Sequence, residues 1–314
     1  MRTGALDLHC DVLSKLLTGR ATAFSGSGSE RLDVTYEKLT AADACLQTFA
    51  VYLPEETPCT FSSVLESVDL FYRHIVPRSD VAFIRTAAQL RTAVDAGRLC
   101  ALLSLEGADG LQGDFAALRI LYHLGVRALG FTWNYANWAA DGVMEPRGAG
   151  LTRQGRKLVR ACNELGMLID VSHLSEKGFW EVADLTDTPV IASHSNAKSV
   201  CDHPRNLSDE QIRAIIAMDG LIGVTFVPWF VSRNETVKVE DLFPHIDRVL
   251  SLGGETCLAF GSDFDGIDRH ITGLADPEGM PELAEKLERR YGRGSAESFV
   301  RGNALRFLLK HLPK

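Results

Sequence analysis

Histidine and carboxylate side chains recur in this 314-residue chain at points where short apolar runs end. The first run, residues 5–9, closes on His9, and Asp11 follows two positions later. Because side chains alternate along a strand, His9 and Asp11 share one face, which points inward if Leu8 packs outward. Zinc accepts nitrogen and oxygen ligands of this kind. The pair alone would also fit a capped strand end with a hydrogen-bonded histidine.

Two further carboxylates follow apolar runs. Glu106 comes after the run 99–105, where an unpaired carboxylate would be unfavourable to bury. One carboxylate can bridge two cations, although a helix N-cap or a surface position would also explain a glutamate here. Asp263 follows the run 257–262 and could be a metal ligand or a general base for a water that a metal activates. Asp265, two positions later, is expected to shape the following turn.

Two histidines complete the set of candidate ligands. His173 follows the run 167–172, and His194 follows the run 189–193. A single histidine in such a place is more often a core or surface residue than a ligand. Together with His9, Asp11 and Glu106, however, they form a set of three histidines and two carboxylates at strand ends. Such a set favours a metal centre.

The elements that must position these residues alternate along the chain. Short apolar runs, typical of strands buried on both faces of a parallel sheet, are separated by amphipathic helical patterns. The expected strands are 5–9, 46–53, 99–105, 127–133, 167–172, 189–193, 221–226 and 257–262. The expected helices are 62–76, 87–97, 115–125, 152–166, 176–185, 208–220 and 240–254. Eight strands that alternate with helices predict a (β/α)8 TIM-type barrel, which carries reactive residues at the carboxyl ends of its strands.

The rest of the chain fits one barrel domain over residues 1–314. A ninth run, 81–85, is interpreted as part of an elaborated connection between the second and third barrel strands. The tail 282–312 is expected to form two extra helices on the outside. The Ser/Gly-rich segment 19–33 is the best candidate for a mobile loop on the active-site rim. Ser208 and Gln211 have the spacing of a capping box.

Composition argues against two classes of partner. The formal net charge is −8 and no run of five basic residues occurs, so a nucleic-acid partner is disfavoured. No apolar stretch reaches about 18 residues, and the first residues lack the apolar region of a signal peptide. We therefore expect no membrane partner and a cytoplasmic protein. Seven widely spaced cysteines without a CxxC pair fit free thiols in a reducing compartment.

Arg205 lies in the loop after the sixth expected strand, within the sequence HPRNL (203–207). A guanidinium in this position could bind a substrate carboxylate through two hydrogen bonds, or it could form a salt bridge within the loop. The residues alone do not separate these two roles.

At this point the chain resembles the membrane (renal) dipeptidase family of zinc dipeptidases, within the amidohydrolase superfamily. The resemblance runs over nearly the whole length, and the order and spacing of several motifs carry it. These motifs are LDLHCD near the start, SLEGADGL (104–111), RALGFTWNYANWAADG (127–142), GLTRQGRKLVRACNELGMLIDVSH (150–173), PVIASHSNAKSVCDHPRNLSD (189–209), GVTFVPWFV (223–231), GSDFDG (261–266) and RGNALRFL (301–308).

The resemblance implies a barrel with two zinc ions and a glutamate that bridges them. The implied ligands are His9 and Asp11 for the first zinc, Glu106 for both, and His173 and His194 for the second. Asp263 would take a proton from the attacking water and pass it to the leaving amine. Arg205 would hold the C-terminal carboxylate of a dipeptide.

One departure from the family pattern concerns the loop after the fourth expected strand. Renal-type members carry a histidine there that contacts the substrate and polarises the scissile carbonyl. Here the matching stretch is FTWN (131–134), so Trp133 stands where that histidine would be. Either Asn134 or a metal alone then polarises the carbonyl, or the reaction differs. Both Trp133 and Asn134 are expected to contact the substrate.

The expected activity is hydrolysis of the amide bond of dipeptides with two Zn²⁺ ions. The family tolerates a D-residue on the C-terminal side, so such dipeptides are included. An alternative keeps the metals and changes the bond to a non-peptide amide, a lactone, an N-acyl amino acid or a phosphoester. A barrel that only binds metal or ligand would need an incomplete ligand set or a blocked mouth. Family members are often dimers, which leaves a homodimer open.

Overall fold

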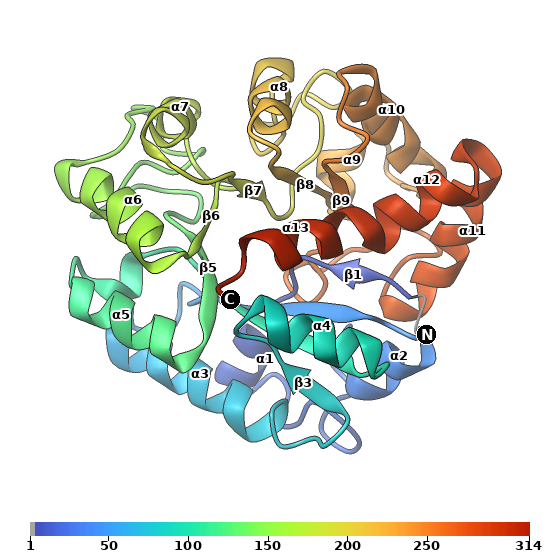
Figure 1. The fold of residues 1–314 in the computed structure, drawn as a ribbon, viewed down its shortest axis with the longest axis horizontal. Coiled ribbons are helices and arrows are strands. Elements are labelled where there is room, and N and C mark those ends of the chain that lie inside the picture. Colours follow the sequence, from blue (N-terminus) through green and yellow to red (C-terminus); the bar gives the residue numbers. More distant parts are fainter. Residues whose placement is uncertain (1–3) are drawn as a thin grey trace.

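The computed structural model describes residues 4–314 of the chain. Strands and helices alternate along it, and helices surround the strands (Figure 1). The strands are β1 (Leu6–Asp7), β2 (Leu46–Val51), β3 (Val81–Phe83), β4 (Leu99–Glu106), β5 (Val126–Gly130), β6 (Leu168–Asp170), β7 (Ile191–Ala192), β8 (Leu221–Val224) and β9 (Leu258–Phe260). The helices are α1 (Val12–Leu17), α2 (Tyr36–Ala41), α3 (Phe61–His74), α4 (Ala87–Asp95), α5 (Phe115–Leu124), α6 (Arg153–Leu165), α7 (Glu176–Leu185), α8 (Asp209–Ala217), α9 (Pro228–Val231), α10 (Phe243–Ser251), α11 (Met280–Tyr291), α12 (Arg293–Glu297) and α13 (Asn303–His311).

The strands close into a parallel barrel. Within residues 4–314 the ring runs β1-β2-β4-β5-β6-β7-β8-β9, and β9 pairs with β1 again. β3 lies outside the ring and pairs only with the first residues of β4. The expected (β/α)8 barrel and its eight strands are confirmed. The run 81–85 also lies where it was expected, in the long connection between the second and third barrel strands.

One end of the barrel is closed by the last helix. Phe307 and Leu308 of α13 are buried in one cluster with Leu6, Leu46 and Leu221, the first residues of their strands. In Figure 1, α13 and α4 lie across the centre of the view, over the strands. Because this helix covers the end where the strands begin, only their carboxyl ends remain available for an open site, as in other barrels of this class.

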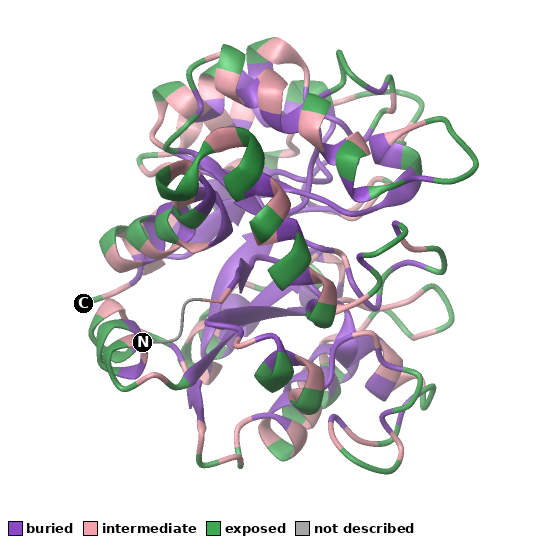
Figure 2. Ribbon diagram, turned by 90° about the vertical axis from the view of Figure 1, so that its right-hand side faces the viewer, coloured by how far each residue is buried: buried purple, intermediate pink, exposed green. Residues whose placement is uncertain are grey.

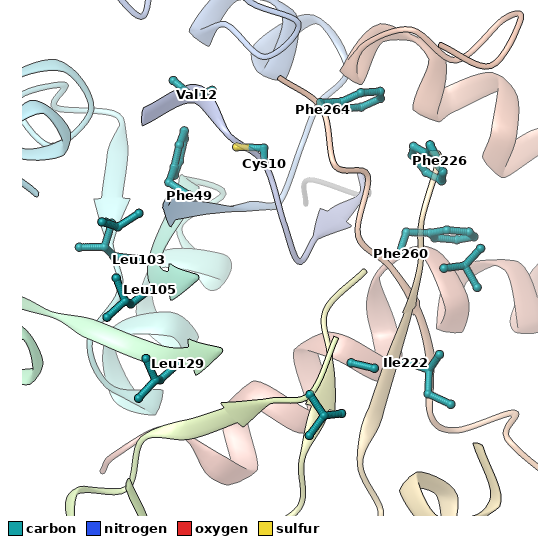
Figure 3. Close-up of a cluster of buried hydrophobic side chains, with 14 of the residues drawn as sticks. Cys10, Val12, Phe49, Leu103, Leu105, Leu129, Ile222, Phe226, Phe260 and Phe264 are labelled. Carbon is teal, nitrogen blue, oxygen red and sulfur yellow. The ribbon is translucent and has the colours of Figure 1, made fainter. Parts of the chain in front are cut away.

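A layer of apolar side chains fills the space between the strands and the surrounding helices. Figure 2 shows buried strands at the centre and exposed residues on the outer faces of the helices. In the close-up of Figure 3, Phe226, Phe260 and Phe264 lie next to one another. The ring centroid of Phe226 lies 5.8 Å from that of Phe260 and 5.6 Å from that of Phe264. This packing fixes the carboxyl ends of β8 and β9, which precede Asp263.

The helices follow the sequence pattern closely. All seven expected helices are present, with ends shifted by a few residues. The capping box is confirmed: Ser208 Oγ accepts from the backbone N–H of Gln211, and Gln211 Oε1 accepts from that of Ser208. The expected helix 240–254 becomes α-helical only at Phe243, because Pro244 fits only the first turn of a helix.

Three short helices were not expected, and the tail differs from its prediction. Helices α1, α2 and α9 have four to six residues each, and helices this short are held by packing rather than by their own propensity. The tail forms three helices and a π-helical turn, Ser298–Gly302, instead of two helices. Gly292, with φ +82°, ends α11 early and starts the extra turn.

The segment 19–33 has no helix or strand, as expected for a loop, but it is packed against the protein. Phe24 is buried in the core. The backbone N–H groups of Asp33 and Val34 donate to the Asp265 carboxylate at 2.8 and 2.9 Å, and Asp33 Oδ2 accepts from the backbone N–H of Asp265 at 2.8 Å. Asp265 therefore joins this loop to the loop after β9. The mobility of the segment stays a prediction.

Close approach of the backbone at Gly223 gives a testable prediction about stability. A Cβ atom on Gly223 would lie 1.9 Å from the carbonyl oxygen of Ser193, directly before His194. We expect Gly223→Ala to lower the free energy of unfolding by about 2 kcal/mol or more, because neither backbone can move away. Urea denaturation measures the change. The control is Gly294→Ala in α12, where no atom lies within 4 Å of the new Cβ, and equal stability of both variants would contradict the prediction.

Candidate metal centre and active site

The five side chains expected as metal ligands meet at the carboxyl end of the barrel. Their donor atoms form groups within 4.8 Å of one another. These groups are His9, Asp11 and Glu106; Glu106, His173 and His194; and His9, His194 and Asp263. These candidate ligands lie at the carboxyl ends of β1, β4, β6 and β7, strands that are far apart in the sequence but end at one mouth of the ring.

Glu106 lies between the two ligand groups. Its Oε2 atom is 3.2 Å from His9 Nε2, whereas its Oε1 atom is 2.7 Å from His173 Nε2 and 3.7 Å from His194 Nε2. On the first side, His9 Nε2 is 3.5 Å from Asp11 Oδ2. One oxygen of the carboxylate therefore faces each group, which is the arrangement that a bridging ligand needs.

A buried carboxylate positions the end of β1. Asp7, on the strand itself, accepts hydrogen bonds from the backbone N–H and the hydroxyl of Ser262 at 2.8 and 2.6 Å. It also accepts from Gln47 Nε2 at 3.0 Å and from the backbone N–H of His9 at 3.2 Å. These bonds join the ends of β1, β2 and β9, and so they fix the backbone that carries His9.

A second buried carboxylate does the same for the two later histidines. Asp170, the last residue of β6, accepts from the backbone N–H and hydroxyl of Ser172 and from the backbone N–H and hydroxyl of Ser193. The Ser193 hydroxyl lies 2.8 Å from His194 Nδ1. This contact leaves the Nε2 atom of His194 directed at Glu106. Sequence reasoning gave no role to Asp7 or Asp170.

Burial sets the charge of the histidines. Burial, together with the positive charge of Arg205, lowers the pKa of His173 to about 4. Burial and the neighbouring His9 lower the pKa of His194 as well. Burial also lowers the pKa of His9, but the carboxylates of Glu106 and Asp11 outweigh it and the net shift is upward. His173 and His194 are therefore neutral at pH 7, the form in which imidazole binds a metal.

The residues present fit a cation. His9 Nε2 and Asp11 Oδ1 are buried and have no hydrogen-bond partner among residues 4–314. Buried polar atoms of this kind are rare unless something binds them. Imidazole nitrogens and carboxylate oxygens are the ligands of zinc-type centres. The donor set and its orphaned atoms therefore agree with the metal ions that the resemblance implies.

Asp263 stands beside this set. Its Oδ1 atom is 3.9 Å from His9 Nε2, and its backbone N–H donates to the carbonyl oxygen of His9 at 3.2 Å. Burial raises the pKa of its carboxyl group, and the negative charge of Asp11 adds to the rise. The residue has φ +65°, a left-handed conformation that aspartate tolerates better than most residues. Its place beside the ligand set makes it a candidate general base.

Arg205 is buried at the edge of the same cavity, with 4 % of its surface exposed. Its guanidinium donates to the carbonyl oxygens of Ser172 and His194, and Nη2 lies 3.1 Å from His173 Nε2. Burial lowers the pKa of Arg205 to about 10, so the side chain stays charged at neutral pH. Among the described residues no carboxylate forms a salt bridge with it within 4 Å, so of the two alternatives the loop salt bridge is absent and the charge is available to a ligand.

Trp133 and Asn134 both line the cavity, as expected. Asn134 Oδ1 lies 3.0 Å from His173 Nδ1. When the Nε2 atom of a histidine binds a metal, Nδ1 carries the proton and donates to a neighbouring acceptor. Asn134 thus orients the His173 ring, and its Nδ2 group is the part left for a substrate.

The cavity above the five ligands has a volume of about 410 Å³. The indole of Trp133 forms part of its wall together with Tyr52, at a centroid distance of 5.4 Å. Val227, Phe230 and Ile267 form a small apolar cluster that lines it elsewhere. Sequence reasoning missed Tyr52, although alternation along the strand 46–53 would have placed it on the inward face. The cavity can hold a small molecule with apolar side chains and a carboxylate.

No helix of residues 4–314 is long and apolar enough to span a membrane.

Comparison with known proteins relates the chain to peptidases. It is 32 % identical over 248 residues to dipeptidase tcpJ of Claviceps purpurea, a match that covers 77 % of this chain and 58 % of that protein. It is 31 % identical over 249 residues to human dipeptidase 3, covering 77 % of this chain and 50 % of that protein. The chain thus spans a little over half the length of these curated relatives.

A solved structure has the same fold over its full length. The crystal structure of the metallo peptidase dipeptidase AC superposes with a TM-score of 0.91 at 28 % identity and covers all of both chains. A metallo peptidase from Rhodobacter sphaeroides, solved with a phosphinate mimic of the dipeptide L-Ala-D-Ala, superposes with a TM-score of 0.88 at 28 % identity, covering 98 % of this chain and 99 % of that one. Since the model of the membrane dipeptidase family, Peptidase family M19, also matches residues 2–311, the chain belongs to that family.

Proposed function

We propose that this protein is a dipeptidase that uses two zinc ions. The observation that carries the proposal is the convergence of His9, Asp11, Glu106, His173 and His194 beneath one cavity that Asp263 and Arg205 also line. Family membership supports a metallopeptidase, and the curated relatives named above are dipeptidases. We propose both the number of metal ions, two, and their identity, zinc.

The donor geometry supports two ions rather than one. His9 and Asp11 would hold the first, His173 and His194 the second, and Glu106 would contact both with its two oxygens. Zinc ions bound there act as Lewis acids that make water nucleophilic at neutral pH and offset the negative charge of the transition state.

Asp263 is proposed to move the proton. Its carboxylate takes a proton from the attacking water as oxygen bonds to the carbonyl carbon, and then gives it to the leaving nitrogen as the C–N bond breaks. The position of Asp263 beside the ligand set, with its Oδ1 atom 3.9 Å from His9 Nε2, supports this role.

Arg205 is proposed to select the substrate. Its buried charge would bind the free carboxylate of the C-terminal residue. The guanidinium carbon of Arg205 lies 5.5 Å from the centroid of the Phe230 ring. A carboxylate anchored there fixes the distance from the chain end to the scissile bond, and this favours dipeptides over longer peptides. Trp133 would contact the side chain of the N-terminal residue, and Asn134 would meet the substrate through its Nδ2 group.

The substrates are proposed to include dipeptides with a C-terminal D-residue. The Rhodobacter sphaeroides relative was solved with a mimic of L-Ala-D-Ala, and the two structures superpose over nearly their whole length. The Trp133 departure is the observation that would favour a non-peptide amide or an N-acyl amino acid instead, and the substrate panel below separates the two functions.

The first prediction concerns the metals and the bond. We expect two zinc ions per chain by elemental analysis and zinc-dependent hydrolysis of L,L- and L,D-dipeptides, followed by release of free amino acids. Removal of the metal should lower the melting temperature, since a ligand at a thousandfold excess over its Kd contributes about 4 kcal/mol to stability. If the zinc-loaded protein hydrolyses N-acyl amino acids and no dipeptide, the dipeptidase assignment is wrong.

The second prediction concerns Asp263. Asp263→Asn should reduce kcat by about 100-fold or more, because the amide cannot accept the proton, and zinc content should stay the same. Asp95→Asn is the control: Asp95 is exposed at the end of α4, outside the cavity, and the variant should retain kcat within a factor of two. Steady-state kinetics with one dipeptide test both, and an active Asp263→Asn variant would rule out the proposed base.

The third prediction concerns Arg205. Arg205→Lys should lower kcat/KM for a dipeptide by about tenfold or more, because lysine cannot form the paired hydrogen bonds of a guanidinium. The loss should be much smaller for the corresponding dipeptide amide, which has no carboxylate to bind. Arg269→Lys, near the mouth but outside the cavity, serves as control. Equal losses on both substrates would show that Arg205 only supports the structure.

A further inference from the structure

The family resemblance places a carbonyl-polarising histidine in the wall where this chain has Trp133. The Oδ1 atom of the neighbouring Asn134 already contacts Nδ1 of the His173 ring, at 3.0 Å. A hydrogen-bond donor for the scissile carbonyl could therefore come from another residue of the same wall, and Tyr52 is the polar side chain that faces Trp133 there.

The strand register places Tyr52 beside the proposed bridging ligand. In the parallel pairing of β2 with β4, Ala50 lies next to Ser104 and Val51 next to Leu105. Tyr52 directly follows the last residue of β2, and Glu106 is the last residue of β4. Both residues line the cavity, so their side chains lie on the interior side of the barrel.

The hydroxyl group of Tyr52 is an unused donor. It makes no hydrogen bond within residues 4–314, although the residue lines the cavity beside the candidate ligands. A phenol hydroxyl has an ordinary pKa of about 10 and so carries its proton at neutral pH. Its ring is held against Trp133, with a centroid distance of 5.4 Å and an angle of 43° between the planes. A neutral donor is thus fixed beside the ligand cluster.

We propose that the Tyr52 hydroxyl is a catalytic residue that donates a hydrogen bond to the carbonyl oxygen of the scissile amide. This inference rests on the proposed function. The hydrogen bond strengthens as the oxygen gains negative charge during attack by water. The proton of the water goes to Asp263, and Tyr52 keeps its own proton throughout, so its part is electrostatic stabilisation alone.

The test compares Tyr52→Phe with the parent protein, both loaded with zinc. The substitution removes one oxygen atom and leaves the ring against Trp133. We expect kcat for a dipeptide to fall by about 100-fold, the loss typical of one oxyanion donor, while KM changes less than threefold. Zinc content and melting temperature should be unchanged. Tyr135→Phe is the matched control, because Tyr135 is exposed and lies outside the cavity.

Binding of a transition-state mimic gives a readout that does not depend on turnover. A phosphinate dipeptide mimic presents an anionic oxygen in place of the carbonyl. By titration calorimetry, Tyr52→Phe should weaken its binding by at least tenfold, whereas Tyr135→Phe should not change it. In the double variant Tyr52→Phe/Trp133→His, the imidazole offers a new donor and should recover at least tenfold of the lost kcat.

The outcomes separate this inference from the proposed function. If the parent protein hydrolyses dipeptides and Tyr52→Phe matches it in kcat and in phosphinate affinity, Tyr52 is not the donor, and the dipeptidase assignment stands. Loss of zinc or of thermal stability in Tyr52→Phe would also overturn the inference, since the role would then be structural. If the zinc-loaded parent neither hydrolyses dipeptides nor binds the phosphinate, the proposed function fails and the inference fails with it.

Discussion

The structure depends on holding three imidazoles and three carboxylates in contact in a nearly dry interior. Carboxylates removed from water resist ionisation, and each raises the pKa of its neighbours. Asp263 shows this directly, because burial and the charge of Asp11 both raise its pKa. A buried cluster of this kind is unfavourable without a compensating positive charge. Bound cations would supply that charge and would use the donor atoms that have no hydrogen-bond partner among residues 4–314.

Two kinds of buried carboxylate serve this arrangement. Asp7 and Asp170 are saturated with hydrogen bonds from serine hydroxyls and backbone N–H groups, and they tie neighbouring strand ends together. Asp11 and Glu106 lie one layer further along the barrel and face histidine nitrogens instead. Asp7 and Asp170 fix the backbone, whereas Asp11 and Glu106 would be available to a metal ion. The candidate metal ligands are therefore positioned by residues that are not among them.

The wall above the centre combines charge with apolar surface. Arg205 contributes a buried positive charge at one side, and Tyr52 and Trp133 contribute paired rings at another. A substrate with a free carboxylate and modest side chains matches both. Trp133 adds apolar area to this wall, and Asn134 and Tyr52 contribute polar groups to the same cavity.

Much of the fold and of the candidate site could be predicted from the sequence alone. The apolar runs predicted the strands because residues buried on both faces of a parallel sheet leave no polar alternation. The residues His9, Glu106, His173 and His194 were identifiable because each follows such a run, and all strands of a parallel barrel end at one mouth. Their family motifs then gave each residue an expected role.

The tertiary structure decided which groups contact one another. Alternation predicts that a side chain points inward, but only the closed barrel brings Tyr52 and Glu106 to the wall of one cavity. His245 is buried like the ligands, yet it accepts from the backbone N–H of Ala197 and contacts the carbonyl oxygen of Val231, far from any carboxylate cluster. One partner of Asp7, Ser262, lies 255 residues away in the sequence. Local sequence cannot fix such pairings, because they depend on how the whole ring closes.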